Sequence, residues 1–256
     1  MDPAITELER WLAPLAFVAL SLAFAVSEAR WPQRPVRQFR DGLALDLAGV
    51  VIAALVSGAA AAGTLAVLAS FAPPKLPGPL AHPVARGALF LVLTDLSRFL
   101  AHFWMHRPWP WRFHHFHHSP RTIYWLSGNR ATPVHVVLFA APTAAWMWTL
   151  QPSLGVVAVN IVAMVFWNHF MHTNVRLPAR WQALLEWIVT TPRYHHVHHA
   201  KDPALYKKNL ASIFTLWDRL AGTYVDPDRV AAESLTFGVG EEGTSGASTV
   251  RMVVGL

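Results

Sequence analysis

Histidines at helical spacing dominate the centre of the chain. Six of the fourteen histidines fall within seventeen residues, inside the stretch 95–118 that reads DLSRFLAHFWMHRPWPWRFHHFHH. The first two, His102 and His106, are spaced i, i+4, so on a helix both rings leave the same face one turn apart. Neutral imidazole is the commonest protein ligand for transition metals, and this spacing therefore indicates a metal site.

Two further groups share the pattern HxxHH, which again places three rings on one helix face. These groups are His114, His117 and His118, and His195, His198 and His199. Together with the first pair they supply eight candidate ligands, enough for two metal ions and too many for one. His115 and His196 are alternatives, because the spacing i, i+1, i+4 also shares a face.

The remaining composition narrows the chemistry that such a site can perform. The chain has no cysteine, so thiol catalysis and iron–sulfur clusters are excluded and any redox chemistry must come from the metals. Histidine suits both iron and zinc. Hydrolytic zinc sites usually add carboxylates, and carboxylates are scarce near the histidines, with Glu186, Asp202 and Asp218 on either side of the last group.

Composition and hydropathy predict an integral membrane protein. Hydrophobic residues make up 54% of the 256 residues and charged residues only 14%, a balance that favours a membrane bundle over a soluble enzyme. The net charge of +6 is spread over the loops between apolar runs. That distribution follows the positive-inside rule and predicts no nucleic-acid partner.

About five membrane spans are expected in an all-α helical bundle. The apolar runs long enough to cross a bilayer cover residues 11–27, 47–72, about 85–106, 133–150 and 153–172. A signal peptide is an alternative for the first run, but the acidic residues before it argue against one. The Arg-rich loops 30–41 and 107–132 should be cytoplasmic, and the histidine groups lie in or beside these loops and in the region after 172. We therefore expect a histidine-rich di-metal cap on the cytoplasmic side of the inner membrane.

The apolar runs divide the chain into four regions. These are a polar N-terminus (1–10), a transmembrane bundle (11–172) with an interfacial histidine segment (107–132), a cytoplasmic cap that completes the metal site (173–225) and a polar tail (226–256). Within the cap we expect a helix near 179–190 and another over HHVHH. The tail pattern Gly238-x-Gly240-x-x-Gly243 matches a dinucleotide fingerprint, but only thirteen residues follow it, too few for a βαβ unit.

Two charged residues lie deep within a predicted span. Asp95 and Arg98 are on the helix stripe that continues to His102 and His106. Charges at that depth normally face the bundle interior, where these two could form a structural ion pair or orient the ligand rings. We favour the orienting role, and we add His169 as a third candidate for it. His82 and His135 are not expected to bind metal.

The order of the histidine groups resembles that of the fatty acid hydroxylase and sterol desaturase superfamily, which are integral-membrane di-iron enzymes. That family has HxxxH, HxxHH, a single histidine and a final HxxHH, and His172 in HFMHTN matches the single histidine. The stretch 209–224, NLASIFTLWDRLAGTY, is similar to the family segment after the last group. The resemblance covers about residues 95–224. It departs at Arg130-Ala131-Thr132-Pro133, where many members have R-x-H-P and where this chain has its histidine displaced to position 135.

The resemblance implies an O₂-dependent oxidoreductase that hydroxylates or desaturates an alkyl position of a membrane lipid, such as a sterol or fatty acyl chain. The implied metal ligands are His102, His106, His114, His117, His118, His172, His195, His198 and His199. Two iron ions would be the cofactors, and zinc could replace them in purified material. A separate ferredoxin, cytochrome or reductase would supply electrons. A membrane zinc hydrolase and a metal transporter remain the alternatives, and the sequence does not predict an oligomeric state.

Overall fold

The computed structural model describes residues 3–35, 42–231, 234–239 and 246–256, and these ranges fold almost entirely as helices and connecting turns. The long helices are α1 (Pro3–Arg30), α2 (Leu43–Leu68), α4 (Pro83–Met105), α5 (Pro133–Leu150) and α6 (Leu154–His172). The short helices are α3 (Gly78–Ala81), α7 (Ala179–Leu185), α8 (Pro192–His198), α9 (Leu216–Ala221) and α10 (Gly246–Val254). Single 3-10 turns are η1 (Pro110–Phe113), η2 (Ser127–Asn129) and η3 (Pro227–Arg229).

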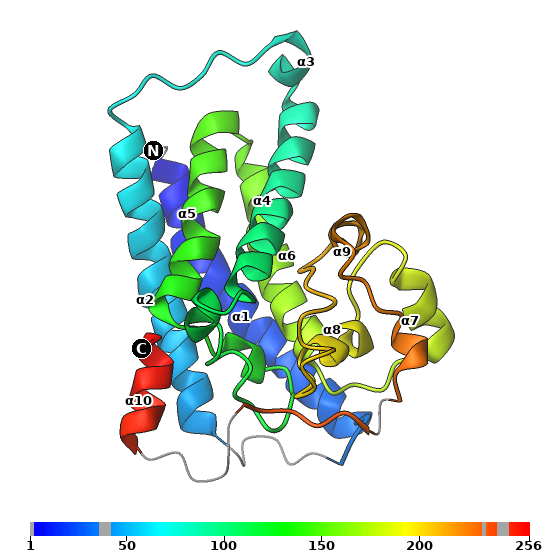
Figure 1. Ribbon diagram of the computed structural model, residues 1–256. Helices are drawn as coiled ribbons and strands as arrows, with labels where there is room; N and C mark the ends of the chain where they lie inside the picture. The colour runs from blue at the N-terminus through cyan, green and yellow to red at the C-terminus, as the bar shows by residue number, and fades with distance from the viewer. Residues whose placement is uncertain (1–2, 36–41, 232–233, 240–245) are drawn as a thin grey trace.

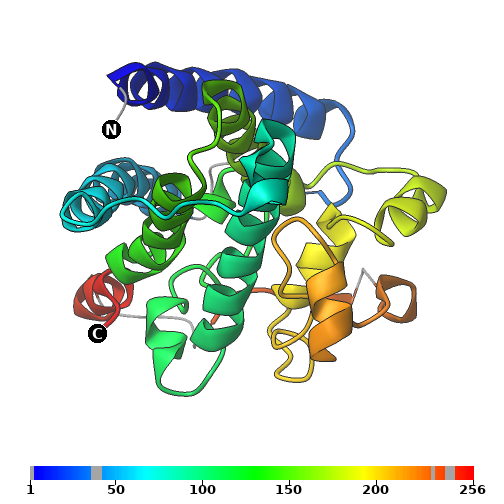
Figure 2. The same cartoon turned by 90° about the horizontal axis from the view of Figure 1, so that it is seen from above.

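The long helices form a bundle in which neighbours in space are often distant in sequence (Figures 1 and 2). Helix α1 packs along α6, α2 packs along α5, and α4 lies against both α5 and α6. At one end of the bundle Phe90 of α4 packs against Met147 and Leu150 of α5 and Val157 of α6. The opposite end carries the histidine groups, and we call it the metal end.

Within the described residues, four helices are long and apolar enough to cross a membrane. They comprise residues 11–30 of α1 together with α2, α5 and α6. Their outward faces carry large apolar side chains, for example Leu22 and Leu55, which are about two-thirds exposed to the surroundings of the chain. The predicted all-α membrane bundle is confirmed. The run at about 85–106 was expected to be a fifth span, but the corresponding helix α4 is not among these four, because Arg86, Asp95 and Arg98 make it more polar; it lies beside them in the bundle.

Three helices that contact the metal site begin with the same local arrangement, α4 at the far end of the bundle and α5 and α8 at the metal end. His82, Thr132 and Thr191 each accept a hydrogen bond from a backbone N–H in the first turn, and a proline follows each of them. A capping side chain satisfies a free N–H, and proline at the first helical position loses no hydrogen bond. The capping residue and the proline that follows it therefore determine where α4, α5 and α8 begin.

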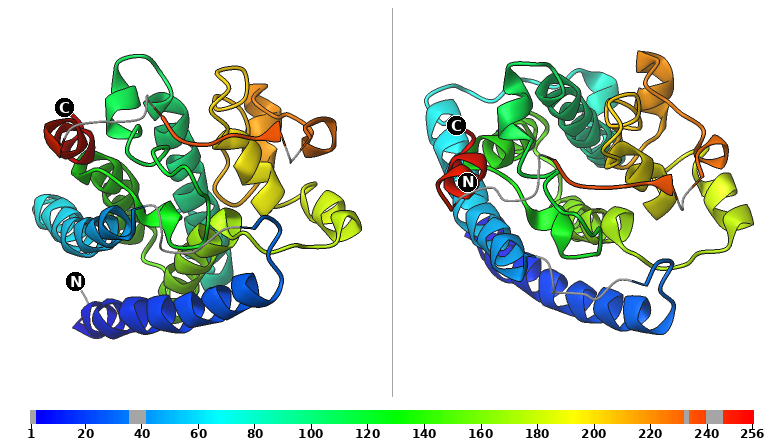
Figure 3. Two further views of the ribbon diagram at one scale, coloured as in Figure 1. Left: turned by 90° about the horizontal axis from the view of Figure 1, so that it is seen from below. Right: turned by 60° about the horizontal axis from the view of Figure 1, so that its bottom comes forward.

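Helices α7, α8 and α9 lie together beside the metal end of the bundle (Figure 3). Helix α7 ends at Leu185, earlier than the expected limit near residue 190. The chain becomes extended there because Val189 forms an isolated bridge with Phe214, and Thr190 N–H donates to the carbonyl of Ile213. That bridge ties the segment before α8 to the segment before α9.

The C-terminal region contains η3 and α10 and one more isolated bridge, between Ala200 and Phe237. Gly240 and Gly243 of the dinucleotide-like pattern lie outside the described residues.

Candidate metal centre

Four segments bring nine buried histidines together at the metal end. The end of α4 supplies His102 and His106, and the turns after η1 supply three more at 114, 117 and 118. The last residue of α6 is His172, and α8 with its C-terminal cap supplies 195, 198 and 199. All nine side chains are at least 94% buried, so the rings are shielded from water.

The nine rings form two groups, in each of which one ring nitrogen per residue lies within 4.8 Å of the others. Cluster A contains His102, His106, His114, His118 and His198. Cluster B contains His117, His172, His195 and His199. In each HxxHH motif the first and last histidines join one cluster and the middle one joins the other. The clusters are therefore adjacent, and the His118 ring stacks on the His199 ring with centroids 4.5 Å apart.

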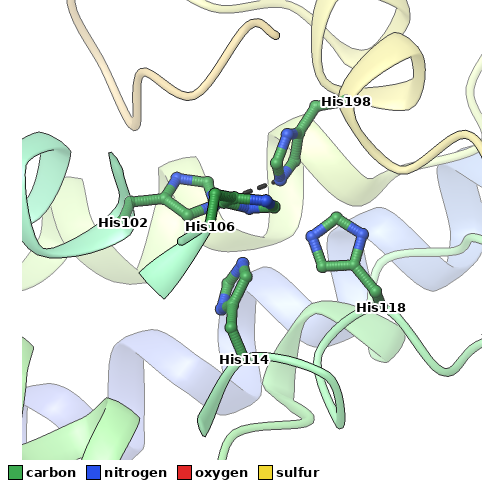
Figure 4. Close-up of side chains that lie close together, drawn as sticks. All are labelled: His102, His106, His114, His118 and His198. Carbon is green, nitrogen blue, oxygen red and sulfur yellow. Dashed lines mark hydrogen bonds between the residues drawn. The ribbon is translucent and has the colours of Figure 1, made fainter. Parts of the chain in front are cut away.

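In cluster A the five rings point toward one another, with His198 above, His114 below, His118 on the right and His102 and His106 on the left in the view of Figure 4. The Nε2 atom of His102 lies 3.1 Å from that of His198 and 3.3 Å from that of His106. The ring of His114 lies 4.6 Å from that of His102, centroid to centroid. The end of α4 and the cap helix α8 thus meet at a single group of nitrogen atoms.

In cluster B the Nε2 atoms converge in the same way around His172. That atom lies 3.3 Å from Nε2 of His117, 3.1 Å from that of His199 and 3.1 Å from that of His195. Space for the His172 ring depends on Gly128 in η2, since a Cβ there would collide with the imidazole. A glycine is therefore required where η2 passes the end of α6.

The tautomers of four of these rings follow from their partners. Nδ1 of each ring faces a backbone carbonyl, which can only accept a hydrogen bond. The pairs are His102 with Leu210 at 2.6 Å, His117 with Arg130 at 3.1 Å, His172 with Asn168 at 2.7 Å and His198 with Lys208 at 3.0 Å. Nδ1 therefore carries the proton in each neutral ring, and Nε2 presents a lone pair to the centre of its cluster.

Converging lone pairs are what a bound cation requires. Nε2 of His102 and Nε2 of His198 face each other without a proton between them, as do those of His117 and His172. In cluster A, Nε2 of His114 and Nε2 of His118 are also buried without a hydrogen-bond partner. Metal ions would satisfy these atoms, because metal-bound histidines characteristically donate the second ring N–H to a carbonyl. The residues therefore fit a metal in each cluster.

Burial also keeps these histidines neutral. It lowers the pKa of His117 to about 3, with a further contribution from neighbouring rings. The pKa values of His118, His198 and His199 are well below the ordinary value for the same reason. At neutral pH the rings are free bases, which is the form that binds metals.

Carboxylates support the site from outside the clusters. Among the described residues, neither cluster includes a carboxylate. Asp95 instead accepts hydrogen bonds from the backbone N–H groups of Ile213 and Phe214 and from Nε1 of Trp217. Because Leu210 lies three residues before Ile213, Asp95 helps to place the carbonyl that receives the His102 proton.

Arg98, the other predicted orienting residue, makes a different contact. Its guanidinium lies over the ring of Phe139, with Cζ 4.2 Å from the ring centroid. Within the described part of the chain no ion pair joins it to Asp95 at salt-bridge distance.

Two supporting acidic residues were not expected from the sequence. Asp46 of α2 forms a buried ion pair with Arg130 at 2.6 Å, and the Arg130 carbonyl accepts from His117. Glu28 of α1 accepts from the backbone N–H of Trp125. It also accepts from the hydroxyl of Thr173 and the backbone N–H of Asn174, the two residues that follow His172. The signal in the sequence was an isolated acid at the edge of each of the first two apolar runs.

The other histidines lie outside the two clusters. His169 contacts Ser21 and stacks on Trp125 at 5.3 Å, while His196 is buried against Arg34 and His115 is partly exposed. His135 is buried, and its Nδ1 lies 3.4 Å from Nδ1 of His114. It therefore contacts a cluster A ring without belonging to the cluster.

A helical membrane bundle whose end holds two clusters of neutral histidines, each able to hold a metal ion, defines a class of membrane protein. The fatty acid hydroxylase family model matches residues 87–223, more than half of the chain, and the chain belongs to this family. The predicted family is confirmed, and with it a membrane enzyme of the hydroxylase type.

Curated relatives agree with that assignment. The ornithine lipid hydroxylase OlsE of Rhizobium tropici is 26% identical over 88% of this chain and 69% of its own length. The alkylglycerol monooxygenases of Xenopus tropicalis and Homo sapiens are 28% and 27% identical over 56% and 53% of this chain. The matched region spans only about a third of those two proteins, at 32% and 30% of their lengths. No solved structure matches the chain.

Proposed function

We propose that this protein is an O₂-dependent di-iron enzyme that hydroxylates an alkyl position of a membrane lipid. The observation that carries the proposal is the pair of adjacent, buried, all-histidine clusters at one end of apolar membrane helices. Two iron ions bound there would supply the O₂ activation needed to oxidise an unactivated C–H bond. The family assignment and the names of both kinds of relative favour hydroxylation over desaturation.

In this proposal the nine cluster histidines are the metal ligands. Asp95 acts indirectly by positioning the loop that fixes the His102 tautomer, and Asp46 acts in the same way on His117 through Arg130. His169 and Arg98 stabilise the packing of the long helices. The 173–225 segment is a cap that completes the site, and the 226–256 segment is a tail attached to it.

The overall reaction is R–H + O₂ + 2e⁻ + 2H⁺ → R–OH + H₂O. The chain's residues contribute by holding neutral ligands and by keeping water out of the site, since every cluster ring is buried. A lipid can reach the metal end without leaving the membrane, which saves about 0.8 kcal/mol for each CH₂ that would otherwise enter water. The two electrons come from a separate donor protein, and the metal end faces the cytoplasm.

The test uses the iron-loaded protein in lipid nanodiscs with a chemical or enzymatic reductant and ¹⁸O₂. The lipid panel should include an ornithine lipid, an alkylglycerol, a sterol and a phospholipid. Incorporation of one ¹⁸O atom into a lipid product, detected by mass spectrometry, supports the proposal. Loss of two hydrogens without label would indicate desaturation instead. Absence of both products at full iron occupancy and with proven electron delivery would refute the lipid-oxidase assignment, and a hydrolysed product would favour the zinc hydrolase.

A further inference from the structure

An apolar surface lies on the outer side of the segment that follows α6. Helix α7, the turn after it and α9 expose six large apolar side chains, each of them at least half accessible. We call this the cap patch, and it consists of Trp181, Leu184, Trp187, Ile188, Leu216 and Leu220. None of these residues belongs to the four apolar spans. So large a group of exposed apolar residues marks an interaction surface.

The two parts of the cap patch form one continuous surface. Thr215, at the start of α9, donates its backbone N–H to the carbonyl of Ile188 and its hydroxyl to the carbonyl of Glu186. The guanidinium of Arg219 also donates to the Glu186 carbonyl and lies over the Trp187 ring, 4.8 Å from its centroid. Helix α9 is thereby fixed against the turn that follows α7.

Two contacts with long helices locate the cap patch along the bundle axis. Trp217 of α9 donates to Asp95, which lies ten residues before the end of α4 and therefore about 15 Å from it. Thr190, two residues after Ile188, accepts from Nε1 of Trp167, which is five residues and about 8 Å before the end of α6. Both parts of the patch thus lie level with long helices of the bundle, α4 and the apolar span α6, and not beyond their ends.

The cap patch also continues the exposed apolar face of the bundle. Trp217 packs against the buried cluster that contains Phe99 of α4, as does Phe103, while Leu100 on the same helix is 55% exposed. Figure 1 shows α9 beside the lower half of α4, with α7 nearer the metal end. A surface that adjoins exposed apolar side chains of the bundle at this level faces the same surroundings as they do.

The charges around the cap patch fit the edge of a bilayer. The Arg180 guanidinium lies over the Trp181 ring and that of Arg219 over Trp187, a combination of aromatic and cationic groups typical of the membrane interface. Glu186, the acidic residue beside the patch, is buried and paired with Arg193. Arg180 and Arg219 at the edge of the cap patch can therefore contact lipid phosphates, and the Glu186 carboxylate is not exposed there.

We propose that the cap patch is immersed in the bilayer leaflet at the metal end, with α9 among the acyl chains and α7 at the interface. The cap is then partly a membrane-embedded element beside the bundle. This inference concerns the lipid surface around the protein and does not depend on which reaction the metal centre performs.

The absence of cysteine allows a direct test with single-cysteine variants of the full chain. Nitroxide labels at Leu184→Cys and Leu220→Cys are compared with two references in nanodiscs that hold one copy each. Leu55→Cys on the outward face of α2 is the lipid reference, and Ala204→Cys in an exposed loop is the water reference. Power saturation then measures the accessibility of each label to O₂, which partitions into lipid, and to a water-soluble nickel chelate.

The expected result is an O₂-to-nickel accessibility ratio at 184 and 220 that matches position 55 and exceeds position 204 several-fold. A ratio like that of position 204 would overturn the proposal, because the patch would then face water. Low accessibility to both reagents would also overturn it, because protein would then cover the patch. Retained metal content shows that each variant is folded, and labels at Trp187→Cys and Ile188→Cys replace any variant that is not.

Discussion

Nδ1 of His102 donates a hydrogen bond of 2.6 Å to the carbonyl of Leu210, a residue 108 positions further along the chain. The loop that contains Leu210 is held by two buried carboxylates. Asp95 accepts from Ile213 and Phe214, and Asp218 accepts from the backbone N–H groups of Leu210 and Ala211. A histidine on a long helix is thus oriented by the cap, and the geometry of cluster A depends on carboxylates that never touch it.

Asp95→Asn should weaken both the fold and cluster A. The amide keeps one acceptor oxygen but places an NH₂ group against backbone donors, leaving buried N–H groups unpaired at a cost of about 1–3 kcal/mol each. We expect a lower melting temperature in detergent and partial loss of metal from cluster A. Asp202→Asn is the control, because Asp202 is exposed and its carboxylate accepts only from Ala204 N–H in the described contacts. Unchanged stability and metal content in Asp95→Asn would contradict the supporting role.

Asp46→Asn should be more destabilising than any change to a surface ion pair. The Asp46 and Arg130 side chains are almost fully buried, so removing one charge leaves the other buried and poorly compensated, at about 3–5 kcal/mol. Tyr124 also loses a charged acceptor. The exposed pair Asp226–Arg229 is the matched comparison, and its disruption should cost about 1 kcal/mol or less. Thermal unfolding of both variants measures the difference, and similar losses would mean that the buried pair contributes little.

Single histidine variants should distinguish the two clusters. His198→Ala removes a nitrogen from cluster A and His117→Ala one from cluster B, so each should lower the metal content by about one ion per chain. His115→Ala is the control, since that ring is adjacent in sequence but belongs to neither cluster. Elemental analysis of the purified protein gives the ratio. Equal losses from all three variants would refute the assignment of ligands.

The regular spacing of the histidines made them predictable from sequence as candidates for the site, although 114, 117 and 118 lie in turns after η1 and not on the helix that their spacing suggested. Their division between clusters was not predictable. His117 and His118 are neighbours in sequence, yet they join different clusters, since the partner that each ring meets is set by how α4, α6 and α8 cross. Those crossings depend on packing between segments up to a hundred residues apart, and a local pattern carries no information about them.

The acidic residues that support the site were only partly predictable from sequence, for the same reason. Asp95 stood out because it interrupts an apolar run, and the structure gives it three hydrogen-bond donors. Glu28 and Asp46 lie at the ends of their runs, where a charged residue normally faces water. Only the folded chain reveals that the loops after η1 and α6 cover them.

Acidification should destabilise the metal-depleted protein. His117 and His196 have pKa values of about 3 in the folded state because they are buried, against about 6.5 when unfolded. As the pH falls, the unfolded chain binds protons first, so their stabilisation is complete above about pH 6.5 and declines toward pH 3. Each such ring loses at most about 1.4 kcal/mol per pH unit.

The melting temperature should therefore drop between about pH 7.5 and about pH 5.5, and the drop should be smaller in His196→Asn than in the parent. His196 is suitable because it lies outside both clusters. His82→Asn, at an exposed position, serves as the control and should leave the pH dependence unchanged. A melting temperature that does not vary over this range would show that the buried rings do not limit stability.

We predict that the metal end faces the cytoplasm, on the basis of where the arginines lie along the bundle. Helix α3 connects α2 to α4 at the end of the bundle far from the histidines. Gly255 lies at the metal end, where a Cβ added to it would lie 3.0 Å from the ring of Phe113. The Arg-rich segments around 30–34 and 107–130 lie at the metal end too, and the positive-inside rule places such segments in the cytoplasm.

In a bacterial host, a fluorescent protein fused after residue 256 should therefore fluoresce, and alkaline phosphatase inserted at residue 78 should be active. When the two reporters are exchanged, with alkaline phosphatase after residue 256 and the fluorescent protein at residue 78, neither should give a signal, because each functions in only one compartment. If both positions reported the same compartment, the two ends of the bundle would lie on one side of the membrane and the transmembrane arrangement would be wrong.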